Sequence, residues 1–177
     1  GISKNSPDGW SVCCLGSCAI TVTVLILIPL ISLILRGYWI LKISKKIPVS
    51  FYKKYAKGER NAESTKHRFH KGQVLYSKLR PYLNKVVLAD EDGYCTSEIL
   101  PLEFERNILP QYARYFLMSP TFLRYANKCS YGVKMPRLGT TDGKKAIVSV
   151  PPIEEQKRIV MAIELAFAQL ASITENL

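Results

Sequence analysis

Apolar and polar residues alternate over residues 69–80, and this period of two predicts a β-strand with one buried face. Val74 and Tyr76 fall on one side of that strand, and Leu75 and Ser77 fall on the other. The strand is expected to end in a corner at Arg80-Pro81-Tyr82. The pattern therefore predicts a half-buried strand that delivers a basic corner to the surface.

Two more strands and a turn are expected directly after this corner. The compact apolar run at residues 85–89 has the length of a strand. Residues 90–93 (DEDG) read as a turn in which Gly93 can supply a positive φ angle. Residues 94–104 then return as a third strand, so this part of the chain is predicted to be a β-sheet.

Helical spacing replaces alternation in the last third of the chain. Residues 110–118 and 120–128 each begin with a proline, which suits the first turn of a helix, and carry aromatic residues at helical spacing. A short strand at residues 148–150 ends at Pro151-Pro152, because proline lacks the N–H that a strand ladder needs. Glu154 and Glu155 then favour a helix start, since negative charge complements its N-terminal dipole. The sequence predicts an α+β fold followed by a long C-terminal helix.

One apolar stripe runs down this last helix at spacings of three and four residues. Its members are Ile159, Ile163, Phe167, Leu170, Ile173 and Leu177. Such a stripe needs a partner, which is either the domain's own core or a second helix.

Charge points to the class of ligand. The net charge is +11. The segment from Lys42 to Lys85 contains thirteen lysines and arginines but two acidic residues. Clustered cations release counterions when they bind a polyanion, and this release favours binding. A solvated basic face is the plainer interpretation. The imbalance favours a surface that faces phosphates.

Candidate DNA-contacting residues cluster at the predicted corners, where loops held by a sheet can present donors to phosphates and base edges. They are Lys78, Arg80, Tyr82, Lys85, Ser130, Tyr131, Lys134, Arg137, Thr140, Thr141 and Lys144. Arg80 and Arg137 are the first candidates for reading bases, because a guanidinium can grip guanine O6 and N7 with two bonds. The alternative for Arg137 is that it braces its loop, and Glu98 is expected to pair with a neighbouring arginine rather than with a cytosine.

Catalytic and metal-binding patterns are absent from the sequence. There is no Gly-x-Gly-x-x-Gly or Gly-x-Ser-x-Gly motif, and residues 90–92 are consecutive acids that cannot share one face. Five cysteines without a Cys-x-x-Cys pair suggest reduced thiols, and His67 and His70 lack the companions that a metal would need. We expect no catalytic residue, no metal and no cofactor.

A resemblance to a known family rests on four segments in a fixed order. These are GQVLYSKLRPYL at residues 72–83, TSE at 96–98, GVKMPRL at 132–138 and VSVPPIEEQKRIV at 148–160. Together they resemble the specificity subunit of type I restriction-modification enzymes. The resemblance implies a β-rich, DNA-binding target-recognition domain at residues 1–152 and the start of a coiled-coil spacer helix at 153–177.

The resemblance also implies partners and a division of labour. The chain would recognise double-stranded DNA in the cytoplasm without catalysis, while methyltransferase subunits and, through them, a restriction subunit perform the chemistry. A second recognition half could pair through the terminal helix. At 177 residues the chain is short of the two recognition domains of a whole specificity subunit, so it is a half or a fragment.

The N-terminal third departs from the family pattern. Residues 11–35 carry no charge, and 19–35 are nearly all apolar, where the resemblance leads us to expect polar, glycine-bearing sequence. Three interpretations of segment 18–36 stay open: an out-of-frame or decayed copy, a pair of buried strands, and a membrane span at the lower length limit with Pro29 inside. Correspondingly, the alternative functions are a membrane-anchored basic protein and a non-functional decayed fragment.

Overall fold

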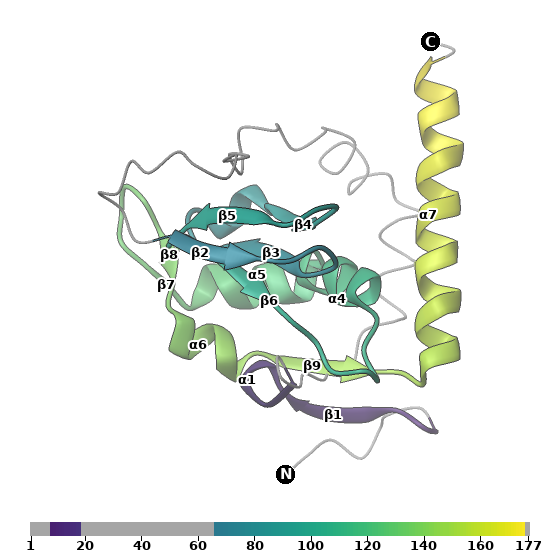
Figure 1. Ribbon diagram of the computed structural model, residues 1–177, viewed down its shortest axis with the longest axis horizontal. Coiled ribbons are helices and arrows are strands. Elements are labelled where there is room, and N and C mark those ends of the chain that lie inside the picture. The colour runs from purple at the N-terminus through teal and green to yellow at the C-terminus, as the bar shows by residue number, and fades with distance from the viewer. Residues whose placement is uncertain (1–7, 19–65, 176–177) are drawn as a thin grey trace.

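A computed structural model describes residues 8–18 and 66–175, which form a mixed array of strands and helices with one long helix beside it (Figure 1). The α+β prediction is confirmed. The first half of the described chain contains β1 (Ser11–Cys14), α1 (Leu15–Cys18), β2 (Lys66–Phe69), β3 (Val74–Ser77), η2 (Pro81–Leu83), β4 (Val86–Leu88), β5 (Gly93–Thr96) and β6 (Ile99–Leu102). The second half contains α4 (Pro110–Leu117), α5 (Pro120–Lys128), β7 (Ser130–Tyr131), β8 (Arg137–Leu138), α6 (Thr140–Lys145), β9 (Ile147–Val150) and α7 (Ile153–Glu175). The apolar segment 19–35 lies outside the described residues, so its three interpretations stay open.

Strand β3 is the centre of the fold. It pairs antiparallel with β4 on one side and with β6 on the other. Its four residues are all buried, which corrects the prediction of one buried face. The reason is that Val74 and Tyr76 pack into the main core, while Leu75 packs on the opposite side into a second, smaller cluster. A strand covered on both faces needs apolar residues in consecutive positions.

The predicted strands at 69–80 and 94–104 are each interrupted. Gly72 adopts a φ of 89° in a tight turn, so residues 66–77 form two strands instead of one. Ser97 and Glu98 form a turn between β5 and β6, so they do not lie within a strand as expected. β2 and β5 then pair with each other, with Phe69 opposite Gly93.

Gly93 is required for a different reason from the one predicted. It begins β5, and it is not among the positive-φ residues. A Cβ at this position would lie 2.6 Å from Cζ of Phe69, whose side chain is almost completely buried. The absence of a side chain therefore allows the Phe69 ring to pack over the strand.

Helices α4 and α5 begin and end close to their predicted bounds, with proline in the first turn of each. The Ser119 hydroxyl caps α5 by accepting a hydrogen bond from the Phe122 amide at 3.2 Å. The Phe122 ring meets the rings of Tyr76 and Phe116 edge to face. The two helices thus cover the sheet through one aromatic cluster in the main core.

The two ends of the described domain meet in a second sheet. β1 pairs antiparallel with β9, from Ser11 opposite Val150 to Cys14 opposite Ile147. The Leu15 amide extends this contact by donating to the Ala146 carbonyl at 2.7 Å. The strand at 148–150 is confirmed, whereas its partner β1 was not anticipated. Segments more than 130 residues apart therefore lie side by side at the lower edge of the molecule (Figure 1).

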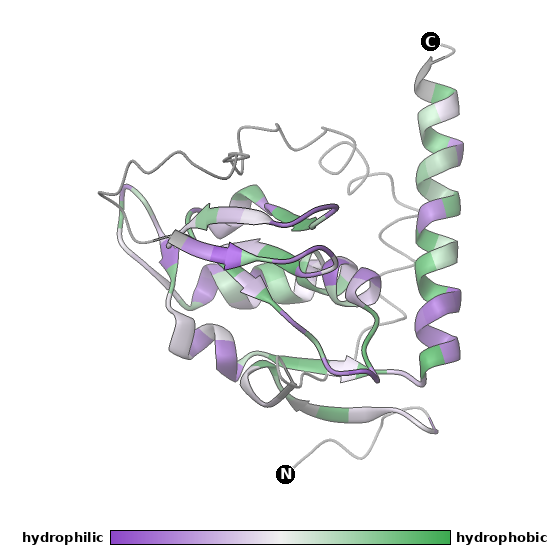
Figure 2. Cartoon of the chain, in the orientation of Figure 1, coloured by the Kyte–Doolittle hydropathy of each residue, from purple (hydrophilic) through white to green (hydrophobic). Residues whose placement is uncertain are grey.

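Helix α7 confirms the long helix that was expected after Pro151-Pro152. Apolar residues recur along its whole length (Figure 2). The Ile159 and Ile163 side chains are buried in the domain's own core, which is one of the two partners expected for the stripe. Phe167 packs against the Tyr115 ring of α4, and Ile173 is 58% exposed. The first turns of α7 therefore pack against the domain, whereas the apolar stripe is exposed near the C-terminal end of the helix. Leu177 lies outside the described residues.

Candidate nucleic-acid interface

Two clusters of predicted DNA-contacting residues meet in the structure. The first is the corner around η2. The second is the hairpin formed by β7 and β8 (Figure 1). Leu79 forms a β-bridge with Arg137, and the Arg80 amide donates to the Pro136 carbonyl at 2.7 Å. The Leu138 amide in turn donates to the Lys78 carbonyl at 3.0 Å. Residues that are 50 or more positions apart therefore share one backbone framework, which we call the corner–hairpin surface. It comprises residues 78–85 and 130–138.

The corner is held by unusual backbone angles. Arg80 and Asn84, on either side of η2, both have left-handed conformations with φ of 52° and 51°. Asn84 is well suited to this region, and its amide nitrogen donates to the Met118 carbonyl at 2.9 Å. Arg80 is costlier there, and its Nε is a buried donor with no partner within the described part of the chain. This places a strained, partly unsatisfied arginine at the predicted reading position, while the Tyr82 side chain beside it is 45% exposed.

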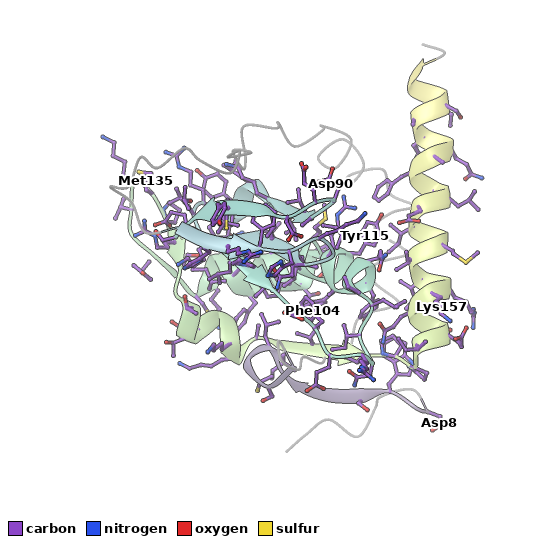
Figure 3. All side chains as sticks on the ribbon, viewed as in Figure 1. Asp8, Asp90, Phe104, Tyr115, Met135 and Lys157 are labelled. Atoms are coloured by element: carbon purple, nitrogen blue, oxygen red, sulfur yellow. The ribbon has the colours of Figure 1, made fainter. Side chains whose placement is uncertain are left out.

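The hairpin projects from the body of the molecule, with Met135 labelled near its tip in Figure 3. Gly132 has a φ of 93°, which an L-residue adopts only with strain and which allows the chain to turn. Lys134 is exposed at the tip between Val133 and Met135. The hairpin therefore presents a cation on a narrow projection whose base is fixed to the corner.

Arg137 is paired with Glu98, as predicted for that glutamate. Its Nε donates to Oε2 of Glu98 and its Nη2 donates to Oε1, both at 2.8 Å. This hydrogen-bonded carboxylate raises the pKa of Arg137, and Tyr131, its cross-strand neighbour, adds to the shift. The arginine side chain is still 40% exposed. The same residue thus braces the hairpin and reaches the surface.

Three of the remaining candidates follow the hairpin in the sequence. Thr140, Thr141 and Lys144 belong to α6, a helix that was expected to be a loop. The Ser130 hydroxyl donates to the Ala126 carbonyl at 2.7 Å, so its proton is used within the fold. Lys78, Thr140 and Lys144 line one cavity of about 300 Å³, whose other walls are mainly apolar. The cavity lies where α6 faces α1, β3 and β6.

Metal ligation finds no support among residues 8–18 and 66–175, where no group of three or more histidine, cysteine or acidic side chains lies close enough to hold an ion. The Nδ1–H of His70 donates to Oδ2 of Asp92 at 3.0 Å, and the Nδ1–H of His67 donates to the Ile99 carbonyl at 3.0 Å. Both histidines therefore serve the β2–β5 strand pair and its surroundings. In the same described ranges, no helix has the length and hydropathy required to cross a bilayer.

Gln156 is a residue whose role sequence reasoning missed. Its side chain is completely buried and makes three hydrogen bonds. Oε1 accepts from the Leu109 amide at 2.8 Å, and Nε2 donates to the carbonyls of Asn107 and Pro151 at 2.7 and 2.8 Å. The available signal was a glutamine at the fourth position of a helix otherwise marked by apolar and charged residues. It joins α7 to the loop that precedes α4.

Comparisons with known proteins agree with this architecture. The sequence profile of the family described as type I restriction modification DNA specificity domain matches residues 37–176. The specificity subunit of the type I restriction enzyme EcoDI from Escherichia coli is 32% identical over 118 residues, which cover 67% of this chain and 26% of that subunit. The chain thus spans about a quarter of the length of this relative.

Solved structures share the fold. The HsdS subunit from Thermoanaerobacter tengcongensis superposes with a TM-score of 0.68 at 17% identity, over 96% of this chain and 44% of that one. A chain from a structure described as the basis of complex assembly and conformational transition of the type I R-M system gives a TM-score of 0.70, also at 17% identity. That match covers 98% of this chain and 46% of the other.

Proposed function

Because the chain belongs to the family of type I restriction modification DNA specificity domains, we propose that it recognises a specific sequence in double-stranded DNA. The observation that carries the proposal is the union of the two predicted basic clusters into the corner–hairpin surface. Its cations come from segments far apart in the sequence, yet they share one backbone framework. A surface that combines positioning cations with a fixed arginine fits duplex recognition, in which phosphate contacts position the protein and base contacts specify the sequence.

The roles within this surface follow from side-chain chemistry. Lys78, Lys85 and Lys134 are proposed to contact phosphates, since an ammonium group acts as a mobile point charge. Arg80 and Arg137 are proposed to read base edges, because a planar guanidinium can form two bonds to guanine. Hydroxyls and phenols in the set are proposed to supply additional contacts: Tyr82, Tyr131, Thr140 and Thr141. Ser130 is proposed to take part as an acceptor, because its proton is used within the fold. Lys144 extends the phosphate-contacting group onto α6.

Salt-dependent binding of the purified chain to duplex DNA tests this proposal. The logarithm of the binding constant should fall linearly with the logarithm of salt concentration, with a slope near 0.9 for each phosphate contacted. Lys134→Ala should reduce the magnitude of that slope by about one unit for any duplex sequence. Lys157→Ala is the matched control, because Lys157 lies on α7 in an ion pair with Glu154. Equal slopes for the wild type and Lys134→Ala would contradict the assignment of Lys134, and a chain without salt-dependent binding would contradict the function.

We further propose that residues 1–152 act as the recognition domain and that α7 begins a spacer toward a partner. Phe167 still packs against Tyr115 of α4, whereas Leu170 is half-buried and Ile173 is 58% exposed. The end of the stripe from Leu170 to Ile173 is proposed to face a second helix, in coiled-coil fashion, from another recognition half. Methyltransferase subunits, and through them a restriction subunit, are the proposed partners that supply the chemistry, and this chain is proposed to supply recognition without catalysis.

Co-purification of the chain with a type I methyltransferase subunit and with a second, differently tagged recognition half tests the partner proposal. A soluble complex is expected for the wild type, and Ile173→Glu should weaken any association that depends on the outer stripe, because it places a charge in an apolar contact. Met161→Glu is a matched control on the same helix, since Met161 is 69% exposed outside the stripe. Equal effects of the two substitutions would contradict a contact through the stripe.

A further inference from the structure

The pair formed by Glu98 and Arg137 has an asymmetric geometry. The carboxylate approaches the guanidinium from the side and takes the Nε and Nη2 donors, each at 2.8 Å. A guanidinium carries five N–H donors, so this arrangement uses two of them. One remaining N–H on Nη1 and one on Nη2 form the terminal edge, which points away from the bound carboxylate. That edge matches the spacing of guanine O6 and N7, which is the commonest specific contact of arginine in the major groove.

Both partners of this pair are fixed by backbone hydrogen bonds. Glu98 lies in the turn between β5 and β6, and its carbonyl accepts from the Lys78 amide at 2.9 Å. Arg137 lies in β8, opposite Tyr131 and bridged to Leu79. The carboxylate and the arginine Cα are therefore held by the same framework that positions the corner. Side-chain freedom that an arginine normally loses on binding DNA is already restricted in the free protein.

Partial exposure distinguishes this pair from a buried structural ion pair. The Arg137 side chain is 40% exposed and the Glu98 side chain is 31% exposed. An exposed ion pair contributes little to stability, because water competes for both charges. The fixed geometry consequently has more effect on where the guanidinium points than on whether the domain folds.

We infer that Glu98 is a positioning residue that presents the terminal edge of Arg137 to a guanine in the recognised DNA sequence. The inference rests on the proposed function and adds a residue that does not itself touch the base. Removal of the Glu98 charge should free the guanidinium to sample other rotamers and to contact phosphates. Preference for one G·C pair should then fall, while binding to unrelated duplexes should be kept or slightly strengthened, because a negative charge has been removed.

Selection of binding sequences from a random duplex library measures this effect. The full chain and its Glu98→Gln variant should enrich related motifs that differ at one position, where the variant loses roughly tenfold of its preference for guanine. Replacing that guanine by 7-deazaguanine, which lacks the N7 acceptor, should weaken the wild type several-fold and leave Glu98→Gln nearly unaffected. Glu154→Gln is the matched control, because it breaks an ion pair on α7 that is remote from the surface. An enriched motif that is identical in wild type and Glu98→Gln would overturn the inference, whereas a wild type that enriches no motif would overturn the proposed function itself.

A charge-swapped pair separates presentation from bracing. The double variant Glu98→Arg with Arg137→Glu keeps two opposite charges at the same two positions. If the pair only braces the hairpin, the swap should retain both the wild-type thermal stability and the wild-type motif. If Glu98 presents Arg137, the swap should retain the stability and lose the preference for guanine at that position. The 7-deazaguanine scan uses the wild type alone, so it does not depend on the folding of any variant. A motif in which binding depends on N7 of no guanine would also overturn the inference.

Discussion

Replacement of Gln156 by leucine should destabilise the domain more than any surface substitution on α7. The Gln156 side chain is completely buried, and leucine has a similar volume, so the substitution removes hydrogen bonds with little change in packing. Three bonds of 2.7–2.8 Å would be lost, one accepted from the Leu109 amide and two donated to backbone carbonyls. The Leu109 amide and the carbonyls of Asn107 and Pro151 would then lose this hydrogen-bond partner.

The magnitude follows from these three bonds. A net contribution of about 1 kcal/mol each, together with the cost of leaving backbone groups unsatisfied, gives a loss of about 3–5 kcal/mol in the free energy of unfolding. The total stability of a domain is about 5–15 kcal/mol, so the change is a large fraction of it. For a domain of this size it corresponds to a fall in Tm of roughly 6–20 °C.

Urea denaturation of the full chain, followed by circular dichroism, measures the effect. Gln169→Leu is the matched control, because Gln169 is exposed on the same helix and should change the stability by less than about 0.5 kcal/mol. A loss below about 1 kcal/mol for Gln156→Leu would refute the reasoning, since it would mean that the three bonds do not join α7 to the domain. Gln156→Glu should be at least as damaging at neutral pH, because it buries a charge at the same position.

Three further predictions concern the β2–β5 region. Gly93→Ala should cost about 1–3 kcal/mol in a urea titration, because its Cβ would lie 2.6 Å from Cζ of the buried Phe69; an unchanged midpoint would show that the ring moves freely. Burial raises the pKa of Cys95 to about 11, so at pH 7.5 its reaction with a thiol reagent should accelerate in parallel with unfolding by urea, and rapid reaction in native buffer would contradict its burial. The Lys71 amide and then the His70 ring hold the pKa of Asp92 below its ordinary value, so Asp92 stabilises the fold above that ordinary value and ceases to do so as the pH falls through the lowered one. Carboxyl NMR should place its titration midpoint below the usual aspartate range, and Asp92→Asn should flatten the acid limb of the stability profile.

The secondary structure was largely predictable because local signals coincide with the observed elements. Proline at the first turn located α4 and α5, and Pro151-Pro152 separated β9 from α7. The burial of both faces of β3 was not predictable, because it depends on a second cluster that forms only when β2 and β5 fold over the sheet. Alternation along a single strand carries no information about what covers its far side.

The candidate site was predictable in its residue types and not in its assembly. Clustered cations marked residues 78–85 and 130–144 separately, but the bonds that join Arg80 to Pro136 and Leu138 to Lys78 are long-range backbone contacts. Glu98 was expected to pair with a neighbouring arginine, whereas the side-on geometry of its pair with Arg137 follows from the fold. Gln156 escaped notice because a polar residue near the start of a helix is ordinarily exposed, and its burial arises from the loop before α4.

The pairing of β1 with β9 determines when this sheet can form during translation. Ser11 pairs with Val150, so β1 has no partner strand during translation until nearly the whole domain has been synthesised. At about 5–20 residues per second that wait lasts roughly 7–28 s, during which a strand edge and the adjoining apolar sequence at residues 19–35 are already outside or emerging. An early strand without its partner is a template for wrong pairing. This sheet therefore cannot close before β9 has been synthesised, and the yield of folded protein depends on how β1 is protected until then.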